Sequence, residues 1–190
     1  MKSKKLTLIL TSLTVLTLMT ACGQSTTKSS TTAAADTTAI TTSAKNSQSS
    51  YFTEKDYDTS YDESTASKIE LSGSSASISG DGVTVSGSTV TISKAGTYVI
   101  SGQSDGVQIK IAADKSDDVK LVLKGATMTN TNAAISATSS GHVYLTLAEG
   151  TTNSLSDSSS NSDEKANAAL FSKVDLTING SGTLLSLIHI

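Results

Sequence analysis

Two groups of acidic residues are the first candidates for chemistry in this chain. Calcium binds six to eight oxygen atoms from carboxylates, Asn side chains and backbone carbonyls, which turn segments supply. Both groups are therefore candidate calcium sites, although neither has the spacing of an EF-hand loop. The alternative for each is an ordinary solvated turn. The first group is Asp114, Asp117 and Asp118, and the second is Asp157, Asn161, Asp163 and Glu164.

The same residues offer little for acid–base or nucleophilic catalysis. Glycoside hydrolysis needs two carboxylates facing each other across a cleft. Asp117 and Asp118 are instead neighbours just before a predicted strand, where solvated turn residues are common. His142 follows Gly141 at the start of another predicted strand, and no Ser or Cys nucleophile motif lies near it. We expect no catalytic residue among them.

Aromatic residues gather in the segment 51–63, which holds three of the five Tyr and one of the two Phe. With its carboxylates, this segment could form a platform on which sugar rings stack through Tyr57 and Tyr61. We favour a second interpretation, a capping segment whose aromatic side chains cover the open apolar end of the first coil. Tyr144 is the best single stacking candidate, because alternation with Val143 and Leu145 predicts that it points outward.

Three near-copies of a short strand indicate how these residues are held. Each copy reads V-x-L-x-[LI] and is followed by Gly and Thr. A β-unit that recurs at offsets of 24 and 31 residues is typical of a solenoid, whose stacked coils bury one another's apolar faces. The copies are residues 119–123, 143–147 and 174–178.

The chain from residue 69 alternates short apolar strands with Gly-containing turns, and no window has helical periodicity with caps. A β-sandwich also uses short strands and turns. The internal copying favours a parallel β-helix, with residues 157–165 as an insertion at one edge. Strands are expected at 69–71, 83–85, 90–92, 98–100, 107–111, 119–123, 133–137, 143–147, 168–171 and 174–178.

Several longer stretches resemble one family, the β-helical carbohydrate-binding domain of clostridial surface lipoproteins. The stretches include TVTISKAGTYVISG at 89–102, VKLVLKG at 119–125 and NAALFSKVDLTINGSGTL at 167–184. The resemblance covers about 51–184. It implies an all-β fold, a right-handed parallel β-helix, that binds cellulose or pectic polymers without established catalysis and holds calcium. It does not assign the calcium ligands residue by residue.

Polysaccharide lyases of this architecture commonly use Arg as the base. All 14 basic residues of this chain are Lys, so we expect no enzyme activity. Two other functions stay open. One is a structural surface adhesin or spacer with protein partners, and the other is a fragment of a lyase whose further coils supply the base.

The N-terminal residues predict a lipid-anchored surface protein. Residues 1–22 combine three Lys with an uncharged apolar run that is short for a membrane span. Met19-Thr20-Ala21-Cys22 resembles a bacterial lipobox, so we expect Cys22, the only cysteine, to carry the lipid. The Ser/Thr-rich residues 23–50 are expected to form a disordered tether. The domain would then lie at the outer face of the cytoplasmic membrane.

Charge excludes one class of partner. The net charge is −3, and loss of the three signal lysines leaves −3 − 3 = −6. Nucleic acid is therefore not an expected partner. We expect a monomer that contacts polysaccharide and, through its lipid, the membrane.

The last six residues need a separate interpretation. Leu185 to Ile190 is the in-frame translation of a common transposon-end sequencing adapter, and we expect it to be an artefact. The alternative is a genuine terminal strand. The domain at 51–184 would then be a truncated β-helix with a frayed apolar end at 174–184.

Overall fold

The computed structural model describes residues 51–157, 166 and 168–187, which are almost entirely β-strand. One short helix, α2 (Glu54–Tyr57), precedes the strands. The strands are β1 (Ser67–Gly73), β2 (Ser75–Ser79), β3 (Val83–Ser86), β4 (Thr89–Ile92), β5 (Gly96–Asp105), β6 (Gln108–Ala112), β7 (Asp118–Asn130), β8 (Ile135–Ser139), β9 (His142–Leu147), β10 (Thr152–Asp157), β11 (Leu170–Ser172), β12 (Asp175–Gly180) and β13 (Thr183–Leu187).

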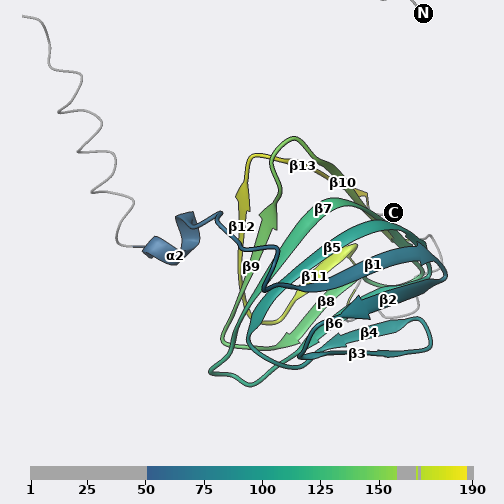
Figure 1. Ribbon diagram of the computed structural model, residues 1–190, viewed down its shortest axis with the longest axis horizontal. Helices are drawn as coiled ribbons and strands as arrows, with labels where there is room; N and C mark the ends of the chain where they lie inside the picture. The colour runs from purple at the N-terminus through teal and green to yellow at the C-terminus, as the bar shows by residue number, and fades with distance from the viewer. Residues whose placement is uncertain (1–50, 158–165, 167, 188–190) are drawn as a thin grey trace, which may run out of the picture.

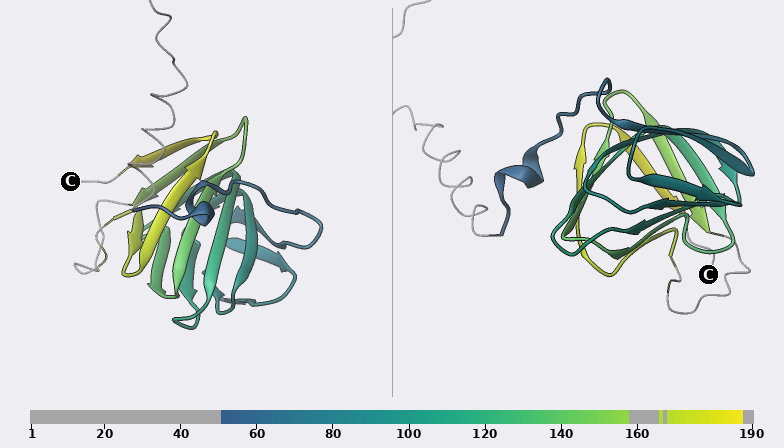
Figure 2. Two further views of the ribbon diagram at one scale, coloured as in Figure 1. Left: turned by 90° about the vertical axis from the view of Figure 1, so that its left-hand side faces the viewer. Right: turned by 60° about the horizontal axis from the view of Figure 1, so that its bottom comes forward.

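The strands form a parallel β-helix with three faces (Figures 1 and 2). The first face contains β1, the N-terminal halves of β5 and β7, then β9 and β12. The second face contains the C-terminal halves of β5 and β7 with β10 and β13. The third face contains β4, β6, β8 and β11. The predicted fold class is therefore confirmed.

Two antiparallel hairpins lie at the N-terminal end of the β-helix. All the other strand pairings are parallel. β2 pairs with β1, and β3 pairs with β4, so β2 and β3 form the last strands of the two sheets on this side. The expectation that the aromatic segment 51–63 caps this end is therefore wrong. That segment lies across the first face, as described below.

Inward side chains of the first face stack in register from coil to coil. Tyr98, Leu121 and Leu145 form one such row, and each is at most 1% exposed. Ile178 continues the row but is 49% exposed, because no described strand lies beyond β12 on this face. Burial of apolar surface between successive coils is what stabilises the stack.

The register confirms one predicted offset and corrects the other. Val143 lies beside Val119, which is the predicted offset of 24 residues. Leu176, not Val174, lies beside Val143, so the next offset is 33 rather than 31. A two-residue shift keeps the same side chains on the same face of a strand, so the apolar pattern alone did not distinguish the two registers.

Glycines allow successive coils to approach closely at the corner after the first face. Gly102 (φ +88°) pairs with Leu71, and Gly180 (φ +97°) pairs with Leu147. A Cβ atom added at either position would lie 2.3 Å from the backbone oxygen of its partner. Only a residue without a side chain fits there, and the positive φ favours glycine independently.

Each of the ten predicted strands overlaps an observed strand, whereas β2 and β10 were not predicted and β13 was only the alternative to an adapter-derived end. β13 includes three of the residues interpreted as adapter-derived, and it pairs with β10. Within the described ranges, no helix is long and apolar enough to cross a membrane. The signal segment 1–22 and tether 23–50, Cys22 among them, lie outside those ranges and stay predictions.

Candidate functional site

Residues 51–66, here called the strap, cross the outer surface of the first face. The strap includes α2, which contacts β12, and continues past β9, β7 and β5 into β1. In the left panel of Figure 2, α2 lies in front of the parallel strands. The strap thus runs across the strands, in the direction in which the coils stack.

Asp56 is the buried anchor of the strap. Its Oδ2 accepts hydrogen bonds from the backbone N–H of Thr53 (2.7 Å) and from the Thr53 hydroxyl (2.9 Å). Its Oδ1 accepts a short hydrogen bond from the Thr177 hydroxyl of β12. His142 Nε2 lies 3.8 Å from the same oxygen. The side-chain amide of Asn179 donates to the backbone oxygen of Asp56 (3.1 Å).

Three ion pairs attach the rest of the strap to β7. Lys120 Nζ lies 3.1 Å from Asp58 Oδ2 and also donates to the backbone oxygen of Ser60 (2.6 Å). The other two pairs have more exposed lysines and join Lys55 to Asp118 at 2.8 Å and Lys124 to Glu63 at 2.7 Å.

These contacts change the acidity of the strap carboxylates. Hydrogen bonds from Ser60, followed by the contact with Lys120, lower the pKa of Asp58 to about 2. The hydrogen bond from Thr177 lowers the pKa of Asp56, and the hydrogen bond from Lys124 lowers the pKa of Glu63. The three carboxylates are therefore ionised at neutral pH and attract the cationic side chains of the sheet.

A small apolar cluster lies under the C-terminal part of the strap. Val99, Val122 and Ala148 are almost completely buried on the outside of the helix. Tyr61 and Ala66 of the strap pack against them. Tyr61, predicted as a sugar-stacking residue, is therefore half-buried, because part of its ring packs against this cluster.

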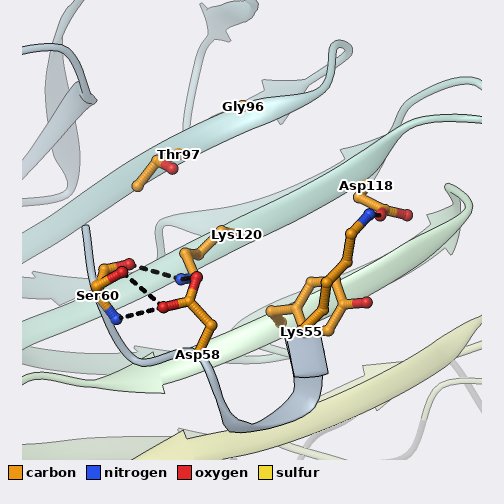
Figure 3. A pocket seen from close by; sticks show the side chains of 8 residues that line it. Lys55, Asp58, Ser60, Gly96, Thr97, Asp118 and Lys120 are labelled. Atoms are coloured by element: carbon orange, nitrogen blue, oxygen red, sulfur yellow. Dashed lines mark hydrogen bonds and ion pairs between the residues drawn. The ribbon is translucent and has the colours of Figure 1, made fainter. Parts of the chain in front are cut away.

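A cleft of about 340 Å³ opens between the strap and the first face (Figure 3). In Figure 3, Lys55 reaches toward Asp118 above the cleft, and Asp58 faces Ser60 and Lys120. The cleft therefore combines cations, carboxylates, hydroxyls and one aromatic ring. It is lined by Lys55, Asp58, Ser60, Gly96, Thr97, Asp118, Lys120 and Tyr144.

Tyr144 points away from the interior, as predicted, but it is not an exposed residue. Only 7% of its surface is accessible, because the strap lies over it. Its ring stacks on His142 with a centroid distance of 4.2 Å and an interplanar angle of 12°. Burial raises the pKa of its hydroxyl. The alternation of residues along the strand correctly predicted that the Tyr144 side chain points outward. It did not predict that the strap, which is distant in sequence, covers this side chain.

Exposed aromatic rings lie at the start of the strap instead. Tyr51, Phe52 and Tyr57 are 87%, 49% and 57% exposed. Phe52 and Tyr57 pack edge to face at a centroid distance of 6.1 Å. Tyr57 is the residue in this group that the sequence analysis named. These rings, on and beside α2, are accessible stacking surfaces in the segment that also supplies Lys55 and Asp58 to the cleft.

The predicted calcium groups have different outcomes. Asp117 accepts a hydrogen bond from the backbone of Ala95, and Asp118 pairs with Lys55. Asp114 does not join them in a metal-holding group, since the described residues contain no cluster of three or more His, Cys, Asp or Glu suited to a metal. The ligand set predicted from this turn is thus not assembled. Asp157 is buried at the end of β10, whereas Asp163 and Glu164 lie outside the described residues.

Sequence reasoning missed the residues that join the strap to the sheet. Lys120 was predictable as an outward residue, since it lies between Val119 and Leu121. Its partner Asp58 lies 62 residues earlier, and no local pattern connects the two. The same holds for Asp56 and Thr177, which are 121 residues apart.

The sequence model of the family described as carbohydrate-binding domain-containing protein matches residues 86–186, more than half of the chain. This chain belongs to that family. The match begins after the strap, so the strap and its aromatic rings are outside the segment that defines the family.

One relative and one solved structure agree with this assignment. A carbohydrate-binding domain-containing protein of Acetivibrio thermocellus is 37% identical over 98 residues, which cover 48% of this chain and 34% of the relative. The structure of a polysaccharide lyase-like protein from C. thermocellum, a gadolinium derivative, has a TM-score of 0.58 and 35% identity. That likeness covers 63% of this chain and 51% of the other. The aligned part of this family member thus spans about a third of one protein and half of the other.

Proposed function

We propose that this member of the carbohydrate-binding family binds polysaccharide without catalysis, at the cleft and the aromatic rings beside it. The observation that carries the proposal is that exposed Phe52 and Tyr57 belong to the same short segment as Lys55 and Asp58, which line a cleft of mixed polar side chains. Aromatic faces pack on the apolar faces of sugar rings, while carboxylates, lysines and hydroxyls bond to sugar hydroxyls. Tyr144 lines the cleft, and Tyr61 packs on the apolar cluster under the strap and so helps to hold the strap in place.

The proposed polymer is of the cellulose or pectic type, and the proposed location is the cell surface. Lipid attachment at Cys22 would hold the domain at the outer face of the membrane, with residues 23–50 as a tether. The net charge of −3 disfavours nucleic acid. We propose that the protein acts as a monomer.

Binding rather than cleavage is supported by the chemistry of the available groups. The chain contains no Arg to serve as the base of a lyase. Two carboxylates line the cleft, but Asp118 is engaged by Lys55 and Asp58 by Lys120. The pKa of Asp58 is lowered to about 2, so its carboxyl group is ionised and does not suit the role of a general acid. The lyase-like description of the solved relative makes lyase activity the second candidate, which appearance of unsaturated uronate products would support.

The binding experiment uses insoluble cellulose and immobilised polygalacturonate with the purified chain. Replacing both Phe52 and Tyr57 with Ala should weaken retention about tenfold, because ring stacking contributes about 0.5–1.5 kcal/mol per pair. Ile78→Ala is the control, since Ile78 is also exposed but lies on β2, away from the strap. Equal retention of the double variant and the control would contradict the proposed site. Retention by neither polymer would favour the adhesin function.

Calcium enters as a separate proposal on the second acidic group. Asp157, Asp163 and Glu164 supply carboxylate oxygens, which suit calcium. Calorimetric titration of the chain with calcium should show binding, and Asp163→Asn with Glu164→Gln should abolish it. Asp114→Asn is the control, because the turn that holds Asp114 does not form a metal-holding group in the described residues. The absence of a calcium signal from the wild-type chain would overturn this proposal.

A further inference from the structure

We propose that the outer surface of the first face is a second binding track, and that an extended chain bearing carboxylates displaces the strap to reach it. This inference rests on the proposed polysaccharide-binding function. It concerns the surface beneath the strap, whereas the proposed site is the open cleft and the rings beside it.

Outward side chains on the first face form two rows along the stack of coils. One row is Thr97, Lys120, Tyr144 and Thr177, and the other is Val99, Val122, Thr146 and Asn179. Neighbouring strands are about 4.8 Å apart, so each row offers a side chain at that spacing. A linear polymer lying along these rows would meet one outward side chain of each row in every coil.

The strap already occupies these rows in the manner of such a polymer. It is an extended segment with five carboxylates and one lysine between residues 51 and 66. Asp58 and Glu63 pair with Lys120 and Lys124, and Asp56 lies beside His142. The cationic groups of the surface are therefore neutralised by carboxylates of the chain itself. An external polymer with regularly spaced carboxylates would compete for the same groups.

Apart from the buried Asp56 and the largely buried side chain of Lys120, the strap is attached by exposed charged groups, and a segment attached in this way opens locally. Glu63 and Lys124 are 45% and 42% exposed in their side chains, and Asp58 is 52% exposed. Water screens ion pairs at such exposure, so they stabilise the closed strap only weakly. Tyr61 and Ala66 are the strap residues that pack on the apolar cluster of Val99, Val122 and Ala148. Segments with few buried apolar contacts open at a small fraction of the global unfolding free energy.

Opening would uncover groups suited to a sugar polymer. Tyr144 stacks on His142 at the centre of the track and would expose an aromatic surface next to Lys120. Val99 and Val122 would expose an apolar strip alongside. When the strap is closed, it shields these three side chains from water. The protein without ligand therefore does not expose an apolar patch on this face.

The test compares two double variants with identical changes in charge and residue type. Asp56→Asn with Glu63→Gln removes two strap carboxylates that contact the sheet, and neither of them lines the cleft. Glu54→Gln with Asp62→Asn is the control, because Asp62 bonds to Ser64 within its own turn. Both doubles repel an acidic polymer less than the wild type by the same charge.

Affinity for soluble polygalacturonate, measured by calorimetry, should be about fivefold higher in the first double than in the control, because the strap competes less. Equal affinities of the two doubles, with retention by the wild type intact, would overturn this inference and leave the proposed function standing. Failure of the wild type to bind any polysaccharide would overturn both.

Hydrogen exchange gives a second readout that needs no polymer. Backbone amides of residues 56–66 should exchange faster than those of Leu121 and Val122, and the first double variant should accelerate the strap amides alone. Exchange of the strap as slow as that of β7 would overturn the inference, because the track would then stay covered. Unchanged protection of β7 in the variants confirms that the coils are intact.

Discussion

Leu121 and Val122 are neighbours in β7, yet they belong to two different kinds of packing. Leu121 points inward and stacks between Tyr98 and Leu145, so its neighbours come from adjacent coils. Val122 points outward and is covered by the strap. Both are 0% exposed. Interior side chains are therefore buried by equivalent residues of adjacent coils, whereas this outer surface is buried by a single additional segment, the strap.

The two surfaces also differ in how freely their residues can vary. Inward positions in the row of Leu121 are apolar in every coil on the first face from Tyr98 to Ile178. The outward row next to it contains Thr97, Lys120, Tyr144 and Thr177, which share no chemistry. The scaffold is therefore compatible with many binding surfaces, and the strap adapts the outer surface to this particular chain.

The largest loss of stability is expected from a substitution in the interior of the β-helix. Leu121→Ala should lower the free energy of unfolding by about 2–5 kcal/mol, because it leaves a cavity between coils. Val122→Ala should lower the free energy of unfolding by only about 1–2 kcal/mol, because the strap can move to fill the space left by the two lost methyl groups. Urea unfolding followed by circular dichroism measures both.

A double-mutant cycle then attributes the cost of Val122→Ala to the strap. Tyr61→Ala should reduce the effect of Val122→Ala, because the two side chains share one contact. Additive costs would show that Val122 is stabilised by the sheet alone. Leu121→Ala should be additive with Tyr61→Ala, since Leu121 belongs to the interior cluster.

A smaller loss of stability is expected from a substitution at the corner after the first face, where successive coils approach closely. Gly102→Ala should destabilise the protein by about 2 kcal/mol, because the new Cβ atom meets the Leu71 oxygen and the positive φ disfavours Ala. Gly87→Ala is the matched control, with φ of +59° but no atom within 4 Å of the added Cβ. Similar losses of thermal stability in the two variants would show that conformation, and not the approach of the coils, accounts for the cost.

The smallest effect is expected from acid, and it should separate the strap from the coils. Asp58 has a folded pKa of about 2 against an ordinary value of 3.8, so its contribution to stability is present above pH 4. The contribution is lost as the pH falls from about 4 toward 2, when the carboxylate becomes protonated. The interior rows through Val119 and Leu121 contain no carboxylate, so they are not affected in this range.

Circular dichroism should detect this separation. The near-ultraviolet signal, which reports on the packing of Tyr61 and Tyr144, should change between pH 4 and pH 2 before the far-ultraviolet strand signal. A simultaneous loss of both signals would mean that strap and coils form one cooperative unit. Asp58→Asn should reduce the near-ultraviolet change in the same window.

The fold could be predicted from sequence because its determinants are local and repeated. Val119, Leu121 and Leu123 reappear 24 residues later as Val143, Leu145 and Leu147, and this recurrence is the stacking interaction itself. The next coil was predicted two residues out of register, because alternation does not distinguish Val174 from Leu176. Strand β10 was missed because its polar residues Ser154 and Ser156 conceal a single buried apolar residue, Leu155.

The site could be predicted only in part. Tyr57 was named and is exposed, whereas Tyr144 was assigned the correct direction and the wrong accessibility. The determinant that was missed is the strap, whose contacts join residues 60 or more positions apart through side chains without a repeated pattern. Such pairings follow from the path of the chain in space, and a single sequence does not encode them in any local periodicity.

The contact of Asp56 with Thr177 and Asn179 has a consequence for the order of folding. These partners follow Asp56 by 121 and 123 residues, and they belong to the last described strand of the first face. Closing so long a loop is unfavourable until the coils between are stacked, so the strap docks late. During synthesis, residues 51–66 emerge first and find their partners last. Docking of α2 onto β12 therefore requires that the coils from β5 to β12 are already stacked.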